Sequence, residues 1–171
     1  MRKLLFQSLV QMSLTEPAPP LDDAALQEVG EALAKVTRRR LGRSLSIREV
    51  DAGSCNACEL EVHALNNPYY NLEGRGIKFV ASPRHADMLL VTGPVTKNME
   101  NALRIAYDCT PDPKLVVAVG DCGCSGGVFG ESYASCGAVE RVVPVDVRVP
   151  GCPPAPLALM QGILAAVRKS T

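Results

Sequence analysis

Strand-like and helix-like segments alternate along most of this chain, and that alternation is the strongest constraint on its fold. The segment KLVVAVG, at 114–120, is an almost unbroken apolar run that ends at a glycine. Such a run is typical of a strand buried on both faces of a sheet. Strands that alternate with helices indicate a parallel sheet covered by helices, so the sequence predicts an α/β fold.

Apolar periodicity and turn residues locate the separate elements. We expect strands at 44–50, 76–81, 87–93, 114–120 and 142–149. We expect helices at 57–67, 96–108 and 154–169, the last with prolines in its first turn, where a helix tolerates them. The carboxyl ends of the strands would then share one edge of the sheet, which is where ligands gather in such folds.

The first 44 residues differ from the rest. The segment TEPAPP, at 15–20, reads as a proline linker, and a helix over about 23–40 follows it. That helix has one apolar stripe, formed by Leu26, Val29, Leu33 and Val36, and a basic end, formed by Lys35, Arg38, Arg39 and Arg40. We therefore divide the chain into an N-terminal arm, 1–44, and a domain, 45–171. The helix either packs on the domain or presents its basic end to a partner or an anionic membrane surface.

The composition points to metal binding in a reducing compartment. Seven cysteines among 171 residues are many, and the chain does not begin with the pattern of a secretory signal. Frequent cysteines then indicate metal ligands more often than disulfides. The 18 basic and 18 acidic residues balance, so no nucleic-acid partner is expected.

Three loops that follow predicted strands carry cysteine. Cys55 and Cys58 follow the strand at 44–50, and Cys152 follows the strand at 142–149, in PGCPP. Cys122 and Cys124 follow the strand at 114–120, in the glycine-rich loop GDCGCSGG. Because these loops share one sheet edge, we expect their thiols to converge. The two remaining cysteines, Cys109 and Cys136, lie elsewhere in the pattern.

Three chemistries compete for these thiols. A thioredoxin-like dithiol would use Cys55 and Cys58 at a helix start, but it leaves the other loops unexplained. A structural zinc ion would take four thiolates, yet zinc ribbons usually keep their ligands on small hairpins. A four-iron cluster is larger than one ion, so well-separated loops can supply its four cysteines. In that case either Cys122 or Cys124 is the third ligand of the cluster.

Other catalytic templates are weak. The two histidines, His63 and His85, have no clear triad setting. Glu59 and Glu61 are near the first cysteines, but as carboxylates on a helix face we expect them to be solvated or at an interface.

Four stretches follow one another in a known order: GSCNACELEV, IKFVASPRHADMLLVTGPVT, PKLVVAVGDCGCSGGVF and VVPVDVRVPGCPPAPLAL. Together they resemble the small subunit of membrane-bound group 4 [NiFe]-hydrogenases of the formate hydrogenlyase type. They also resemble the homologous B-type (PSST, 20 kDa) subunit of NADH:quinone oxidoreductase, complex I. The resemblance covers about residues 45–168.

The resemblance implies a flavodoxin-like, three-layer domain with one [4Fe–4S] cluster at the carboxyl ends of the strands. It implies Cys55, Cys58, Cys122 and Cys152 as ligands, with Cys124 extra, and it puts Arg84 and His85 in a loop near the cluster and the large subunit. The complex I branch carries adjacent cysteines at the first site. Asn56 and Ala57 separate them here, as in the hydrogenase branch.

The function that the resemblance implies is electron transfer, without catalysis by this subunit alone. The cluster would lie next to the [NiFe] centre of a partner large subunit, or beside the complex I D-type homologue in the quinone-reducing alternative. A ferredoxin-like iron–sulfur subunit and integral membrane subunits would complete the assembly. The expected location is the cytoplasmic side of the inner membrane, as a peripheral part of that complex.

Overall fold

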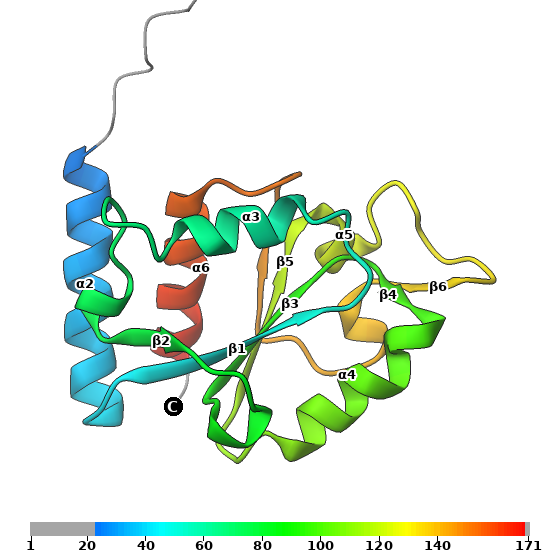
Figure 1. Ribbon diagram of the computed structural model, residues 1–171, viewed down its shortest axis with the longest axis horizontal. Coiled ribbons are helices and arrows are strands. Elements are labelled where there is room, and N and C mark those ends of the chain that lie inside the picture. Colours follow the sequence, from blue (N-terminus) through cyan, green and yellow to red (C-terminus); the bar gives the residue numbers. More distant parts are fainter. Residues whose placement is uncertain (1–22, 170–171) are drawn as a thin grey trace, which may run out of the picture.

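A five-stranded parallel sheet forms the centre of the molecule in a computed structural model, which describes residues 23–169 (Figure 1). The strand order is β2-β1-β3-β5-β7, with strands at Ile77–Phe79, Leu45–Asp51, Met88–Thr92, Leu115–Val119 and Val147–Val149. This is the flavodoxin-like order, in which the first strand lies between the second and the third. The predicted α/β class and parallel sheet are confirmed.

Helices cover both faces of the sheet, which gives three layers (Figure 1). One face packs on α2 (Asp23–Leu41), α3 (Ala57–Ala64) and α6 (Pro156–Lys169). The other face packs on α4 (Lys97–Cys109) and on the short helix η3 (Val139–Arg141). Because strand residues alternate between faces, Leu90 belongs to the first core and Leu89 to the second.

Helix α2 lies side by side with α6, and both run toward the amino-terminal edge of the strands (Figure 1). Leu26 and Leu33 from the predicted apolar stripe are buried in the core, with Leu33 fully inaccessible. The structure shows this helix packed on the domain and leaves its basic end exposed. The proline linker at 15–20 lies outside the described residues, and the boundary after residue 44 stays a prediction.

Several local elements differ from those expected. The strand predicted at 142–149 begins only at Val147, because Val142 and Val143 turn inward after η3 to fill the second core. The glycine-rich loop contains a short helix, α5 (Gly120–Ser125). A two-stranded antiparallel ribbon, β4 (Val95–Thr96) with β6 (Ser135–Gly137), was not anticipated. Two further single turns are η1 (Glu73–Arg75) and η2 (Pro83–His85).

Within residues 23–169, no helix combines the length and the apolar character that crossing a bilayer requires.

Candidate metal centre

Four cysteines lie at the carboxyl edge of the sheet, as the loop pattern predicted. Cys55 is in the connection from β1 to α3, and Cys58 is in the first turn of α3. Cys122 is in α5, directly after β5, and Cys152 is in the connection from β7 to α6. Cys58 is buried and Cys122 half-buried, whereas Cys55 and Cys152 are exposed. These four cysteines form the thiol rim.

Backbone contacts bring three cysteine-bearing loops together. Gly120 at the start of α5 lies against the Cys58 sulfur, because a Cβ added to this glycine would come within 2.7 Å of that Sγ. The same point is 3.4 Å from the carbonyl oxygen of Gly151, the neighbour of Cys152. The amide of Asp121 donates to that carbonyl at 2.8 Å, and the Gly151 amide donates to the Asp121 carboxylate at 2.8 Å. The last cysteine loop is therefore fixed directly beside α5.

Electrostatic interactions link all four thiols. Burial, then the Glu59 carboxylate, then Cys55, Cys122 and Cys152 raise the pKa of Cys58 to about 12, from an ordinary value of 9. Burial raises the pKa of Cys122 as well, followed by Cys152 and Cys55. In the apo-protein each added thiolate thus opposes ionisation of the next. A bound metal centre would remove that opposition, because metals bind cysteine as the thiolate.

Cys124 faces a different environment. Its sulfur donates to the carbonyl of Ala118 at 3.7 Å, toward the sheet. Burial raises the pKa of Cys124, a hydrogen bond from the Val149 backbone lowers it, and none of the thiol rim contributes to the shift. Between the two cysteines of GDCGC, these contacts favour Cys122 as the member of the rim.

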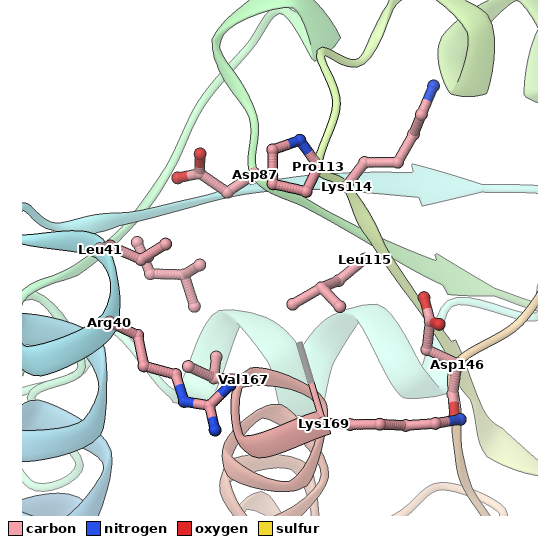
Figure 2. Close-up of a pocket in the computed structure, with 10 residues that line it drawn as sticks. Arg40, Leu41, Asp87, Pro113, Lys114, Leu115, Asp146, Val167 and Lys169 are labelled. Carbon is pink, nitrogen blue, oxygen red and sulfur yellow. The ribbon is translucent and has the colours of Figure 1, made fainter. Parts of the chain in front are cut away.

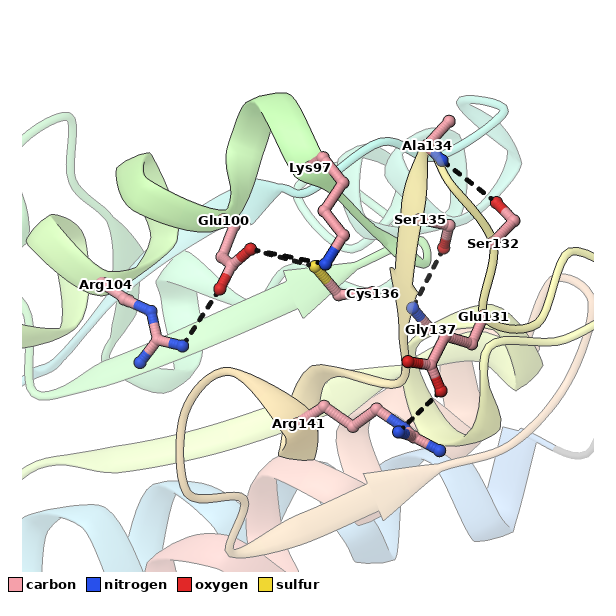
Figure 3. A network of polar contacts seen from close by, with 10 residues as sticks. All are labelled: Lys97, Glu100, Arg104, Glu131, Ser132, Ala134, Ser135, Cys136, Gly137 and Arg141. Atoms are coloured by element: carbon pink, nitrogen blue, oxygen red, sulfur yellow. Dashed lines mark hydrogen bonds and ion pairs between the residues drawn. The ribbon is translucent and has the colours of Figure 1, made fainter.

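The other two cysteines are outside the three loops that carry the rim. Cys109 is the last residue of α4. Cys136 lies on β6 and donates to the Glu100 carboxylate at 3.2 Å, while Lys97 and Arg104 flank the same carboxylate (Figure 3). Cys136 thereby takes part in a polar network that joins α4 to β6.

Glycine residues provide space for the rim sulfurs. Gly120 has φ +78° and Gly127 has φ +54°, conformations that side chains rarely adopt. A Cβ at Gly127 would lie 2.7 Å from the Cys122 sulfur. Each position therefore favours glycine for two reasons: the backbone has a positive φ, and a cysteine sulfur leaves no room for a side chain.

The donor set of the rim consists of cysteine thiols alone. Among residues 23–169, no three or more His, Cys, Asp or Glu side chains lie close enough together to hold one metal ion. Four cysteines are the ligands that a four-iron cluster takes, and a structural zinc ion also takes four, so the donor set by itself fits both groups.

Arg84 and His85 are exposed on η2, which packs against α4, and no hydrogen bond or ion pair joins them to the thiol rim. Of the two alternatives expected for Glu59, solvation is wrong: it is 7% exposed, and both carboxylate oxygens are buried with no hydrogen-bond partner among the described residues. A place at an interface with a partner subunit stays a prediction. Burial and the charge of Glu59 raise the pKa of the nearby Glu49. The sequence held no signal for this carboxylate pair, because the pairing depends on how α3 lies on β1.

Comparison with known proteins identifies the family. Residues 55–166 match the family described as NADH ubiquinone oxidoreductase, 20 Kd subunit. The chain is 48% identical to a probable membrane-bound hydrogenase subunit, mbhJ, of Pyrococcus furiosus over 129 residues, which are 75% of this chain and 77% of that protein. It is 47% identical to the B-type subunit of the NADH-quinone oxidoreductase of Desulfovibrio desulfuricans, covering 72% of this chain and 66% of that protein.

A relative and a solved structure extend the comparison. Formate hydrogenlyase subunit 7 of Escherichia coli is 42% identical over 88% of this chain, although the match spans only 58% of that longer protein. A chain in the structure of the membrane-bound sulfane sulfur reductase, an archaeal respiratory membrane complex, superposes with a TM-score of 0.65 at 35% identity, covering 81% of this chain and 75% of that one. The chain therefore belongs to the family of the 20 kDa subunit of NADH ubiquinone oxidoreductase, an oxidoreductase family that includes subunits of a membrane-bound hydrogenase, a formate hydrogenlyase and an NADH-quinone oxidoreductase.

Proposed function

We propose that this chain is the electron-transfer small subunit of a membrane-bound hydrogenase complex. It would hold one [4Fe–4S] cluster through Cys55, Cys58, Cys122 and Cys152, next to the [NiFe] centre of a large subunit. A ferredoxin-like subunit would carry electrons onward, and the chain would sit peripherally on the cytoplasmic side of the membrane. The observation that carries the proposal is geometric: Gly120 and Asp121, at the start of the helix that holds Cys122, contact the Cys58 sulfur and the Gly151 backbone beside Cys152, whereas the Cys124 sulfur is directed to the Ala118 carbonyl.

Different residues of the chain would hold different sides of the cluster. When bound, the cluster accepts and releases single electrons, at a potential that hydrogen bonds to its sulfurs and solvent exposure set. Cys58 anchors the buried side of the site, and the exposed Cys55 and Cys152 face the outside of the domain. Gly120 and Gly127 leave room for ligand sulfurs, and the Asp121–Gly151 hydrogen bonds fix the last ligand loop.

A complex I-like role, in which the cluster passes electrons to quinone, is the second candidate. The 47% identity to the B-type subunit of an NADH-quinone oxidoreductase is almost equal to the 48% identity to the hydrogenase subunit, so overall similarity does not separate them. The separation of Cys55 from Cys58 by Asn56 and Ala57 favours the hydrogenase role, because the complex I branch has adjacent cysteines here.

Serine variants test the ligand assignment. After anaerobic reconstitution, we expect Cys122→Ser and Cys152→Ser to lose the iron and acid-labile sulfide that the wild type binds, because serine does not replace a thiolate ligand well. The matched controls Cys109→Ser and Cys136→Ser should retain both. Cys124→Ser should retain them too, since its sulfur is directed to Ala118. Equal losses in all five variants would overturn the assignment.

Metal analysis of the native complex separates the two candidate roles. The complex is purified through a tag on this chain, and nickel is measured beside iron. Nickel in a stoichiometric amount with a copurified large subunit supports the hydrogenase role. Iron without nickel, together with quinone-dependent oxidation of NADH, would support the complex I-like role instead.

A further inference from the structure

Positive charge gathers at the edge of the molecule opposite the thiol rim. Helices α2 and α6 both end at the amino-terminal edge of the sheet, where their last turns carry Arg38, Arg39 and Arg40 and, on α6, Arg168 and Lys169. Lys35 and Arg43 flank the end of α2. All seven cationic residues are exposed. Together these seven residues form the basic edge.

The charges of this neutral chain are therefore separated in space. Residues 32–47 contain five cations and no carboxylate. The thiol rim, by contrast, is accompanied by carboxylates on and beside its own loops, at Asp51, Glu59, Glu61 and Asp121. A net charge of zero consequently conceals a basic end and an acidic end, and the basic end can attract an anionic surface without help from the rest of the chain.

Stabilisation of the helix ends does not account for all of these cations. A cation offsets the helix dipole only within the last turn. Lys35 lies before that turn, and Arg43 lies beyond the helix. Lys35, Arg38 and Arg39 are spaced by three and four residues, so they share one exposed face, and no hydrogen bond or ion pair joins their side chains to residues 23–169.

Two carboxylates at the basic edge, Asp87 and Asp146, are already engaged in hydrogen bonds. Asp87 accepts from the Arg43 guanidinium at 2.8 Å and from the Ser46 amide at 2.9 Å. Asp146 accepts from the Val116 amide at 2.8 Å. Both carboxylates therefore accept hydrogen bonds from other residues of the sheet edge.

A hollow of about 690 Å³ opens between the two helix ends (Figure 2). Arg40 and Lys169 approach it from α2 and α6, and its apolar lining includes Leu41, Leu115 and Val167. Lys169 also donates to the Asp146 carbonyl at 2.9 Å. The edge thus presents cationic groups beside apolar surface. An anionic phospholipid layer presents the matching groups, which are negatively charged headgroups next to apolar acyl chains.

We propose that the basic edge is a docking surface for anionic phospholipid headgroups. It extends the proposed function, which already sets the chain at a membrane. Docking through this edge turns the thiol rim away from the bilayer, because the two lie at opposite ends of the strands, and leaves the rim free for a protein partner.

Vesicle binding tests the proposal with the purified full-length chain. Co-sedimentation with phosphatidylcholine vesicles is compared with and without added phosphatidylglycerol. Each juxtamembrane cation strengthens attraction to an anionic surface about fivefold, so Arg38→Gln/Arg39→Gln should weaken binding on the order of 30-fold. The matched control Arg104→Gln/Arg141→Gln removes the same charge from exposed sites outside the basic edge and should change binding less than about twofold.

Every outcome of the vesicle experiment either supports or overturns the proposal. Binding that requires phosphatidylglycerol, falls in high salt and is lost only in the Arg38/Arg39 variant supports the proposal. No binding by the wild type, equal binding to neutral vesicles, or equal losses in both double variants overturns it. Iron and sulfide are measured on the same preparations. A chain that binds vesicles but no cluster would refute the proposed function alone, and a chain that binds the cluster but no vesicles would refute this inference alone.

Discussion

Replacing Gly120 with alanine probes the contact between α5 and the thiol rim. The added methyl would lie 2.7 Å from the Cys58 sulfur and 3.4 Å from the Gly151 carbonyl oxygen. The first distance is too short for two nonbonded atoms, so the sulfur or the α5 turn must move. Because Gly151 precedes Cys152, the displacement reaches two of the four rim residues directly.

The magnitude follows from two separate costs. The φ of +78° costs a non-glycine residue about 1–2 kcal/mol. Overpacking of a close site typically costs a further 1–3 kcal/mol. We therefore expect Gly120→Ala to lower the free energy of unfolding by about 2–5 kcal/mol. Gly76→Ala is the matched control, because Gly76 has φ +80° and nothing within 4 Å of its added Cβ. It should lose only the backbone part, about 1–2 kcal/mol.

Two assays separate the backbone cost from the effect on the site. Urea denaturation of the apo-protein gives the free energies of unfolding, and anaerobic reconstitution gives iron and sulfide per chain. We expect Gly120→Ala to be the less stable of the two variants and to bind less iron than wild type, while Gly76→Ala binds a normal amount. The reasoning is refuted if both variants have the same stability and both reconstitute fully.

Two further predictions concern the core and the pH dependence of the apo-protein. Leu33→Ala should lower the free energy of unfolding by about 2–5 kcal/mol in urea denaturation, because Leu33 is fully buried between α2 and the domain. Ile105→Ala, at a 54% exposed position, should change it by less than about 0.5 kcal/mol, and equal effects would contradict the packing of α2. The pKa of Cys58 is raised to about 12 from 9 in the folded state, so its bound proton stabilises the fold below pH 9, and this contribution is lost as the pH rises toward 12. Denaturation midpoints measured over that range should fall more steeply in wild type than in Cys58→Ser, and parallel curves would show that the thiol is not buried as described.

The regular part of the fold was predictable because each long element carries its own pattern. The apolar run at 115–119 has to be buried on both faces, and the spacing from Leu26 to Val36 is that of one helix face. The β4–β6 ribbon was not predictable, because its strands are two and three residues long and pair across about forty residues of chain. Val142 and Val143 have the pattern of a strand, but the second core needs them at a turn after η3.

The candidate site was predictable to the level of loops. A cysteine that follows a buried parallel strand must lie at the carboxyl edge, so the sequence indicated which loops approach one another. The choice between Cys122 and Cys124 needed the direction of each side chain within α5, which the glycine-rich sequence does not encode locally. The burial of Glu59 likewise depends on how α3 is tilted against β1, a tertiary feature with no periodic signal.

Iron and acid-labile sulfide in the anaerobically reconstituted wild-type chain, with electron paramagnetic resonance of the reduced sample, test the central claim most directly. A [4Fe–4S] cluster held by the four rim cysteines predicts about four iron and four sulfide per chain and the signal of a single reduced cubane. A colourless preparation that binds one zinc ion per chain, or neither iron nor sulfide, would contradict it.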